Sequence, residues 1–354
     1  MMKRVLRIFL RTLAALTALA VTFALVLLGG QAVVYVRRQA ACEVYADHGV
    51  TLGGVSQYVA VRGKADAPLL LWVHGGPGSP LSPVAYTFGE ALEQDYLVVH
   101  WDQRGSGRSW TPGGDAVTPA QLQSDLAELV EWLCAEYGRE QVVLVGYSFG
   151  TALCLPYAAA HPERVAAYIA VSQVTDLTQA VTLSADRVLA HPDVTASDAA
   201  ALREGRDTLL GDGEDPYGHI MAYQRLQSIC AAYFPKGKGG AGNLFWAGAF
   251  SPDCGVRGVL WKVIQMTPAY VSVYGETMQW LFCDFRAEAV QRLQVPVLFI
   301  SGEYDYVTPP DTVADYVAAL KAPSVEHVVL PDCAHSPFFD DPEAFAETVR
   351  AFAR

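Results

Sequence analysis

The segment Gly146–Gly150 (Gly-Tyr-Ser-Phe-Gly) constrains the fold more than any other part of the sequence. It follows an apolar run typical of a buried strand, Gln141 to Val145, and it leads into a helical stretch, Thr151 to Ala160. Glycines two positions before and two positions after Ser148 permit a turn so tight that the serine backbone is strained. We therefore predict a strand, a sharp elbow and a helix, with the Ser148 hydroxyl presented above the sheet.

The rest of the chain alternates short β-rich runs with helical runs, which is the pattern of a parallel α/β sheet. Several runs are apolar at consecutive positions, as strands covered on both faces must be. The predicted strands are Leu69–His74, Tyr96–Asp102, Gln141–Val145, Val165–Val171, Val297–Ile300 and Val325–Val329. Capped helix starts are predicted at Thr118-Pro119, where Gln121 completes a capping box, and at Asp341-Pro342.

The length of 354 residues is enough for a large core with a second lobe. Residues 172–293 interrupt the sheet pattern with helical segments rich in aromatic residues. An insertion of about 120 residues between two strands is too long for a loop, so we predict a helical cap. The predicted organisation is a membrane anchor with its juxtamembrane segment (1–43), a first part of the core (44–171), the cap (172–293) and a second part of the core (294–354).

Residues 12–36 contain no charge and, as a helix, would be about 37 Å long, against a hydrocarbon layer of about 30 Å. Four basic residues precede this run and two follow it, so the positive-inside bias favours a cytoplasmic N-terminus. We therefore predict a single-pass protein of the cell membrane, held in the lipid bilayer by an N-terminal transmembrane helix, with an extracytoplasmic body. The alternative is a secreted protein, because Gly30-Gln31-Ala32 offers a site for signal cleavage.

The remainder of the chain is strongly acidic. Residues 1–38 hold six of the 25 basic residues and no acidic one, which leaves 19 basic against 37 acidic residues and a formal charge of −18. Such a body repels phosphate backbones, so nucleic acid is not an expected partner. The seven cysteines show no zinc-type spacing, and we expect neither a metal nor a cofactor. Pairing among Cys230, Cys254 and Cys283 of the cap is left open.

A serine hydroxyl is a weak nucleophile at neutral pH and needs a base that a third group orients. Asp305 and His335 each follow the end of a later predicted strand, at the sheet edge where Ser148 is also expected. Glu303 and Asp311 compete with Asp305 for the acidic role. We predict that Ser148 is the nucleophile, His335 the base and Asp305 its partner.

Together these residues resemble the α/β-hydrolase fold and, within it, the proline iminopeptidase group of serine peptidases (peptidase family S33). Two further segments carry the narrower resemblance: His74-Gly-Gly-Pro-Gly78 after one strand, and Trp101-Asp-Gln-Arg-Gly-Ser-Gly-Arg-Ser109 after the next. The resemblance runs from about residue 50 to the C-terminus. It implies a mostly parallel central sheet with helices on both faces and an inserted helical cap.

The resemblance also implies roles for the residues around the nucleophile. The expected oxyanion hole is formed by the amides of Gly76 and Phe149, and the expected substrate-pocket loop by His74, Gly75, Pro77 and Gly78. The turn that contains Asp102, Arg104 and Arg108 is expected to be braced by ion pairs beside the site.

One family feature is missing. Iminopeptidases of this group bind the free amino terminus of the substrate through cap glutamates, one of them in a Trp-x-x-Trp-Glu segment. Residues 172–293 contain no such segment, and none of the central cap glutamates, Glu204, Glu214 and Glu276, stands beside two tryptophans. An unpaired ammonium in a closed pocket is costly, so the resemblance leaves peptide specificity open.

We therefore expect a serine hydrolase that cleaves a small peptide or ester through an acyl-enzyme. By resemblance, an aminopeptidase of the proline iminopeptidase type is the first choice, and a carboxylesterase or lipase-type hydrolase of small acyl esters is the alternative. Acyl transfer to an acceptor other than water would use the same residues. A non-catalytic, membrane-tethered binding protein of the same fold is the alternative from another class, and it predicts a broken triad.

Overall fold

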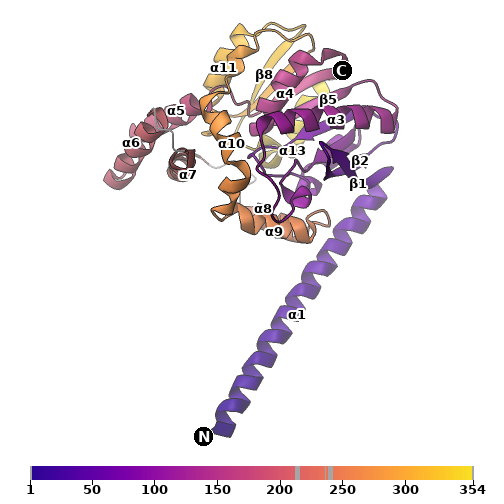
Figure 1. The fold of residues 1–354 in the computed structure, drawn as a ribbon, viewed down its shortest axis with the longest axis vertical. Helices are drawn as coiled ribbons and strands as arrows, with labels where there is room; N and C mark the ends of the chain where they lie inside the picture. The colour runs from indigo at the N-terminus through magenta and orange to yellow at the C-terminus, as the bar shows by residue number, and fades with distance from the viewer. Residues whose placement is uncertain (1, 212–215, 236, 238–241, 353–354) are drawn as a thin grey trace.

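The computed structural model describes residues 2–211, 216–235, 237 and 242–352. An eight-stranded sheet flanked by helices forms its centre, and a long N-terminal helix extends away from it (Figure 1). The strands are β1 (Val44–Leu52), β2 (Val55–Gly63), β3 (Leu69–Val73), β4 (Leu97–Trp101), β5 (Val142–Tyr147), β6 (Val165–Val171), β7 (Val297–Gly302) and β8 (Val325–Leu330). The α-helices are α1 (Met2–Ala41), α2 (Glu90–Glu93), α3 (Pro119–Tyr137), α4 (Phe149–Ala160), α5 (Leu177–Leu189), α6 (Ala196–Leu210), α7 (Pro216–Tyr233), α8 (Gly242–Phe250), α9 (Gly255–Gln265), α10 (Ala269–Cys283), α11 (Pro310–Ala319), α12 (Pro337–Asp340) and α13 (Pro342–Phe352).

The sheet is mostly parallel, as predicted. Its strand order is β1-β2-β4-β3-β5-β6-β7-β8. The pairs β1–β2 and β2–β4 are antiparallel, and every other neighbouring pair is parallel. All six predicted strands are present, and their ends lie within two residues of the predicted ends. The parallel arrangement brings the carboxyl ends of β5, β7 and β8 to one edge of the sheet.

The hairpin of β1 and β2 lies outside the predicted strands. β1 is an edge strand that is only partly buried, and it carries Asp47 and His48, so it lacks a continuous apolar run. The turn Gly53-Gly54, with φ of 51° and 80°, is the signal that could have identified the hairpin, because two-residue hairpin turns favour positive φ at both positions.

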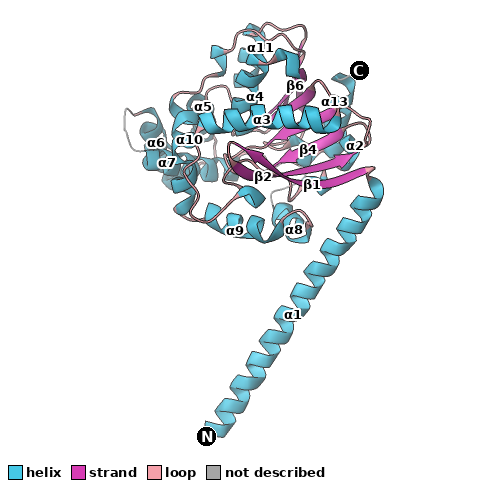
Figure 2. Cartoon of the chain, turned by 45° about the vertical axis from the view of Figure 1, so that its right-hand side comes forward, coloured by secondary structure: helices cyan, strands magenta, loops and turns pink. Residues whose placement is uncertain are grey.

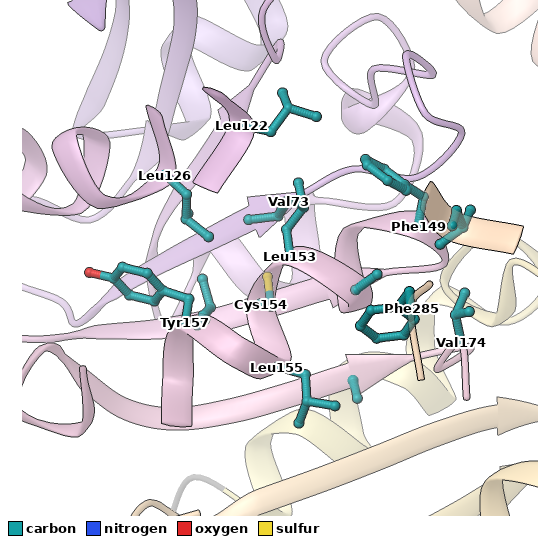
Figure 3. Packing of buried hydrophobic residues seen from close by; sticks show 14 of the residues in the cluster. Val73, Leu122, Leu126, Phe149, Leu153, Cys154, Leu155, Tyr157, Val174 and Phe285 are labelled. Carbon is teal, nitrogen blue, oxygen red and sulfur yellow. The ribbon is translucent and has the colours of Figure 1, made fainter. Parts of the chain in front are cut away.

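Each face of the sheet packs against its own helices, which explains the apolar runs. In β3, Val73 shares a buried cluster with Leu126 of α3 and Leu153 of α4, part of which Figure 3 shows. Leu70 and Trp72 point to the other face and share a cluster with residues of α2, α12 and α13. Figure 2 shows α3 lying across the front of the sheet.

The predicted helix starts are confirmed. The Thr118 hydroxyl accepts a hydrogen bond from the Gln121 amide (3.2 Å), and the Gln121 side chain accepts one from the Thr118 amide (3.0 Å), which completes the capping box of α3. Gly138 ends the same helix in a left-handed conformation (φ 60°). At the start of α13, the Asp341 carboxylate accepts a hydrogen bond from the Ala344 amide (3.1 Å). In α13, Phe345 and Val349 are buried and Phe352 is partly buried, which gives the helix one packed face.

Between β6 and β7, the described residues form six α-helices, α5 to α10, in the stretch where the insertion is predicted. We call residues 172–293 the cap. Figure 1 shows α5, α6 and α7 beside the sheet, and α8 and α9 on the side toward which α1 extends. Among the described residues, Cys230, Cys254 and Cys283 of the cap form no disulfide bond.

Helix α1 is a continuous helix of 40 residues. Its segment Arg4–Ala41 is long and apolar enough to cross a membrane, and no residue in the most apolar part of that segment is buried by the body. A signal sequence near an N-terminus has the same composition. The helix therefore agrees with the predicted span by length and composition.

The C-terminal end of α1 packs against the body. The Gln31 side-chain amide donates a hydrogen bond to the carbonyl of Ala249 at the end of α8 (2.8 Å). Arg38 forms an ion pair with Glu93 of α2, in which both side chains are buried. The neighbouring Arg37 pairs with Glu90 at the surface (2.6 Å). One side of this end of α1 is thus held against the body at Gln31 and Arg38.

Candidate active site

Ser148 forms the predicted elbow by itself. Strand β5 ends at Tyr147 and helix α4 begins at Phe149, so one residue makes the whole turn. The backbone of Ser148 has φ 51° and ψ −122°, a combination that residues with a side chain rarely adopt. Backbone strain of this kind is concentrated at functional sites, where the surrounding structure maintains it.

The two glycines of the elbow are required by close packing. A Cβ on Gly146 would lie 2.9 Å from the Cα of Thr151 in α4. A Cβ on Gly150 would overlap the carbonyl of Val73 at the end of β3. Any side chain at either position would therefore displace the first turn of α4 from the strands beneath it.

A chain of hydrogen bonds joins the three residues that the sequence analysis selected. His335 Nε2 lies 2.9 Å from Ser148 Oγ, and His335 Nδ1 lies 2.9 Å and 3.0 Å from the two carboxylate oxygens of Asp305. Because an ionised carboxylate can only accept, Nδ1 carries the proton of the neutral imidazole and Nε2 presents its lone pair to the serine hydroxyl. This is the tautomer that can take a proton from Ser148.

The carboxylate of Asp305 is buried, and both of its oxygens accept hydrogen bonds. It accepts hydrogen bonds from the amides of Val307 (2.9 Å) and Thr308 (3.0 Å) and from the Thr308 hydroxyl (2.8 Å). Burial acts to raise the pKa of Asp305, but His335 and these hydrogen bonds hold that pKa below its usual value. The group is therefore ionised at neutral pH and accepts the hydrogen bond of the imidazole.

The competing acids lie elsewhere. Glu303 is exposed and accepts a hydrogen bond from the Asp332 amide (3.0 Å). Asp311 is exposed and pairs with Arg187 of the cap. Of the three acidic residues in this turn, Asp305 is the one that contacts His335.

The loop of residues 74–78, which contains the predicted oxyanion donor Gly76 and which we call the oxyanion loop, lies against the serine. A Cβ on Gly75 would be 2.9 Å from the Cβ of Ser148, so only glycine fits there. Gly76 has a φ of 116°, which also favours glycine. Phe149 is the first residue of α4, and the first amides of a helix have no acceptor within it. The loop and the first residue of α4 thus bring backbone groups close to the Ser148 side chain.

The side chain of His74 braces this loop from inside the core. It is 1% exposed, and its Nε2 accepts a hydrogen bond from the Gln103 amide (3.1 Å), so Nδ1 carries the proton and donates to the Gly75 carbonyl (2.9 Å). Burial lowers the pKa of His74 to about 3. His74 was expected with the substrate-pocket loop, and its buried ring supports that loop through the hydrogen bond to the Gly75 carbonyl.

Two cap helices hold the loop in place, a role that the sequence analysis missed. The Trp261 indole and the Gln265 amide, both on α9, donate to the carbonyl of Gly78 (2.7 Å and 2.6 Å). The Tyr270 hydroxyl, on α10, donates to the carbonyl of Pro77 (2.9 Å). The acceptors are backbone atoms, which leave no signal in the sequence, so only the spatial arrangement identifies these contacts.

The turn after β4 is braced differently from the prediction. Arg104 pairs with buried Asp125 of α3 (2.7 Å), and Arg108 pairs with Asp47 of β1 (3.2 Å). Asp102 forms no side-chain ion pair with either arginine.

The carboxylate of Asp102 is instead fully buried. It accepts hydrogen bonds from the Ser82 hydroxyl (2.5 Å) and the Arg108 amide (2.8 Å). Burial raises its pKa to about 6. The expected bracing exists, but the partners come from α3 and β1, which the sequence order could not indicate.

The two central cap glutamates that the structure describes, Glu204 and Glu276, lie at the surface. Glu204 is exposed and pairs with exposed Arg225 (2.8 Å), and Glu276 is exposed on α10. Glu214 lies outside the described residues. Aromatic rings lie closer to the triad: the Tyr147 ring is 5.4 Å from the His335 ring. Within the residues that the structure describes, no group of three or more His, Cys, Asp or Glu side chains is placed to hold a metal ion.

Comparisons with known proteins agree with the fold. The family model described as alpha/beta hydrolase fold matches residues 68–342. A Bacillus subtilis (strain 168) protein named Probable aminopeptidase YbaC is 25% identical over 310 residues, which cover 86% of this chain and 95% of that protein. A proline iminopeptidase of Lactobacillus delbrueckii subsp. lactis is 24% identical over 312 residues, covering 83% and 93%. Among solved structures, a proline iminopeptidase-related protein from Thermus thermophilus has a TM-score of 0.58 at 19% identity, covering 88% and 99%.

Proposed function

Because the chain belongs to the α/β-hydrolase fold family, we propose that it is a serine hydrolase that cleaves an ester or amide through an acyl-enzyme. The observation that carries this proposal is the continuous hydrogen-bond chain from Ser148 through His335 to Asp305. A non-catalytic binding protein of the same fold has no need to keep a strained serine in contact with a correctly oriented imidazole.

In the proposed reaction, Ser148 Oγ attacks the substrate carbonyl carbon while its proton moves to His335 Nε2. The resulting imidazolium donates this proton to the leaving alcohol or amine, and the acyl group stays on Ser148. A water molecule then gives its proton to His335 and attacks the acyl carbon, which releases the acid and returns the proton to Ser148. Asp305 holds the imidazole in place and stabilises its positive charge in both steps.

The amides of Gly76 and Phe149 are the proposed donors to the oxyanion that forms at the carbonyl. Such donors stabilise the transition state because they are already oriented when charge develops. Two features support the assignment: Gly75 lies against Ser148, and helix α4 begins at Phe149, immediately after Ser148. The positive end of the α4 dipole adds to the same effect.

Two substrate classes are supported by different observations. The full-length relatives are named as aminopeptidases or proline iminopeptidases, which supports cleavage of peptides at a free amino terminus. The cap glutamates support an ester instead, because Glu204 is exposed and pairs with Arg225, and Glu276 is exposed on α10, so neither is enclosed in a pocket that would compensate a buried ammonium group. We propose an acyl ester as the leading class, and an amino-terminal peptide as the second.

The test uses a fluorophosphonate probe, which reacts only with an activated serine, together with a panel of aminoacyl anilides and short acyl esters. Wild type should be labelled and active. Ser148→Ala should be unlabelled and should lose activity by about 10⁴-fold or more. The exposed Ser124→Ala serves as the matched control. A folded wild-type protein that stays unlabelled would identify a binding protein, and activity on anilides alone would exclude the ester class.

We also propose that α1 anchors the protein in the cell membrane, with the catalytic body on the extracytoplasmic side. The alternative signal-cleavage site, Gly30-Gln31-Ala32, lies inside α1 where Gln31 bonds to the cap, which supports a retained helix. Retention of the full chain in membranes after an alkaline wash tests the anchor. A membrane-impermeant thiol reagent should label the exposed Cys283 in intact cells; labelling only after permeabilisation would reverse the orientation.

A further inference from the structure

Helix α9 of the cap is amphipathic in an unusual sense, because its exposed face is the apolar one. Four apolar side chains stand at i, i+3, i+4 and i+7 along one side of this helix, and a fifth follows directly after its end. They are exposed by 77%, 55%, 48%, 57% and 88% respectively: Val256, Val259, Leu260, Val263 and Met266. We call these five residues the α9 stripe. A contiguous apolar surface of this kind marks a contact with another apolar phase or protein.

The opposite face of α9 is occupied. Gly258 and Trp261 are buried, and Trp261 and Gln265 donate to the carbonyl of Gly78 in the oxyanion loop. The direction of the helix is therefore fixed by its contacts with the active site. The stripe cannot turn inward without breaking those hydrogen bonds.

The stripe lies next to the place where the N-terminal helix leaves the body. Gly30 of α1 lies directly against the ring of Phe250, and Gln31 bonds to Ala249, both at the end of α8. Helix α9 follows α8 after a short turn that ends at Cys254. Figures 1 and 2 both place α8 and α9 on the side of the body toward which α1 extends.

Charge around the stripe is basic in a body that is otherwise acidic. Arg257 and Lys262 are exposed on the two flanks of the stripe, and α9 contains no acidic residue. Trp246 of α8 is 49% exposed on the adjoining helix. Apolar side chains flanked by basic groups, with tryptophan nearby, are the features of helices that lie in the headgroup layer of an anionic membrane.

We propose that the α9 stripe docks into the surface of the membrane that α1 spans, and that the enzyme consequently acts on acyl compounds that partition into that layer. This inference rests on the proposed membrane anchor and serine hydrolysis. Because α9 contacts both the bilayer and the oxyanion loop, it places the reacting serine close to lipid-soluble substrates. A second copy of the chain is the rival occupant, but it would not explain the position beside α1 or the basic flanks.

The experiment uses the full chain in vesicles of phosphatidylethanolamine and phosphatidylglycerol. A bimane dye is attached at Val263→Cys, with Cys42→Ser and Cys283→Ser as background, and at Ala318→Cys on α11 as the matched control. Ala318 is exposed on α11, and Figure 1 shows α11 at the end of the body opposite to the side toward which α1 extends. Nitroxide-labelled lipid should quench the dye at position 263 at least about three times as strongly as the dye at position 318. Equal quenching, or a dye at position 263 that is shielded from lipid by a second chain, would overturn the proposal.

A second comparison keeps the test independent of the dye. Val259→Glu/Val263→Glu should lower the ratio of long-chain ester hydrolysis in vesicles to short-chain ester hydrolysis in water by about tenfold, while Ala314→Glu/Ala318→Glu should not change it. An unchanged ratio in the α9 variant would contradict the proposal. Fluorophosphonate labelling and alkaline retention are measured in the same samples, so loss of serine reactivity or of the anchor is distinguished from failure of docking.

Discussion

Single residues decide the chemistry of this site, and many of them could be predicted. Gly146 and Gly150 must be glycine because their backbones lie close to α4 and β3. The spacing of the two glycines around Ser148 can be recognised in the sequence. The sequence also predicted that Ser148, Asp305 and His335 would converge, and the structure places them within hydrogen-bond distance. Their catalytic roles stay a prediction. The brace formed by His74 could not be foreseen, because its partner Gln103 is reached only through the fold.

The role of Asp305 is tested by Asp305→Asn. An asparagine side chain cannot supply the negative charge that stabilises the imidazolium, and its amide can donate to Nδ1 and so favour the wrong tautomer. We expect kcat on a short acyl ester to fall by about 10³- to 10⁴-fold. The matched control is Asp311→Asn, whose side chain is exposed and pairs with Arg187. A similar loss in both variants would show that the assignment of the acid is wrong.

The buried Asp102 gives the protein a specific dependence of stability on pH. Its pKa is about 6 in the folded chain against an ordinary value of 3.8, so the folded state keeps a proton that the unfolded state has lost between these values. The free energy of unfolding therefore falls as pH rises through this window, by on the order of 3 kcal/mol. Asp102→Asn removes this titration while it can still accept a hydrogen bond from Arg108.

The free energy of unfolding of Asp102→Asn minus that of wild type should therefore increase as the pH rises from about 4 to about 6, the window set by the pKa of Asp102. Urea unfolding followed at several pH values measures the difference between the two proteins. Subtraction removes the contributions of other buried groups, such as His100, whose pKa burial lowers to about 3. The exposed Asp115→Asn controls for the loss of one carboxylate. A difference that does not change with pH would contradict the prediction.

Among the elements, strands buried on both faces and capped helices were the predictable ones. Strand β3 is a continuous apolar run because each of its faces packs against helices. The start of α3 is marked by the capping box of Thr118 and Gln121. The hairpin β1–β2 escaped prediction because an edge strand needs no such run. The contacts of α9 and α10 with the oxyanion loop were also unpredictable, since their acceptors are backbone carbonyls.

These cap contacts predict that α9 positions the oxyanion loop. Trp261→Phe keeps an aromatic ring but loses the indole donor to Gly78, and Gln265→Leu removes the second donor to the same carbonyl. Each lost hydrogen bond should cost about 1 kcal/mol, so the double variant should lower kcat by about tenfold or more.

A positioning role predicts a change in kcat with little change in KM for a short ester. The comparison is Val256→Ala, on the exposed face of the same helix, where the side chain is 77% exposed. If the double variant changes only thermal stability and leaves kcat as in Val256→Ala, the helices support the fold but not the geometry of the loop.

At the scale of the whole molecule, two regions of opposite character are joined at one place. The basic N-terminal helix carries no acidic residue before Glu43, and the body carries a formal charge of −18. They meet where Arg38 is buried against Glu93, next to the contact of Gln31 with the cap. The sequence predicted the apolar helix from its composition. It could not predict this junction, because a basic residue such as Arg38 directly after an apolar run is typical of the end of a transmembrane helix.

The buried pair predicts that α1 stabilises the body as well as anchoring it. Arg38→Met leaves the Glu93 carboxylate buried without its partner, which should lower the free energy of unfolding by about 3 to 5 kcal/mol. Arg38→Met/Glu93→Leu removes both charges and should recover most of this loss. Arg37→Met is the matched control, because Arg37 and Glu90 are exposed, and it should cost at most about 1 kcal/mol. Urea unfolding of the full chain in detergent measures all three. Equal effects of Arg37→Met and Arg38→Met would mean that the junction only tethers the body and does not stabilise it.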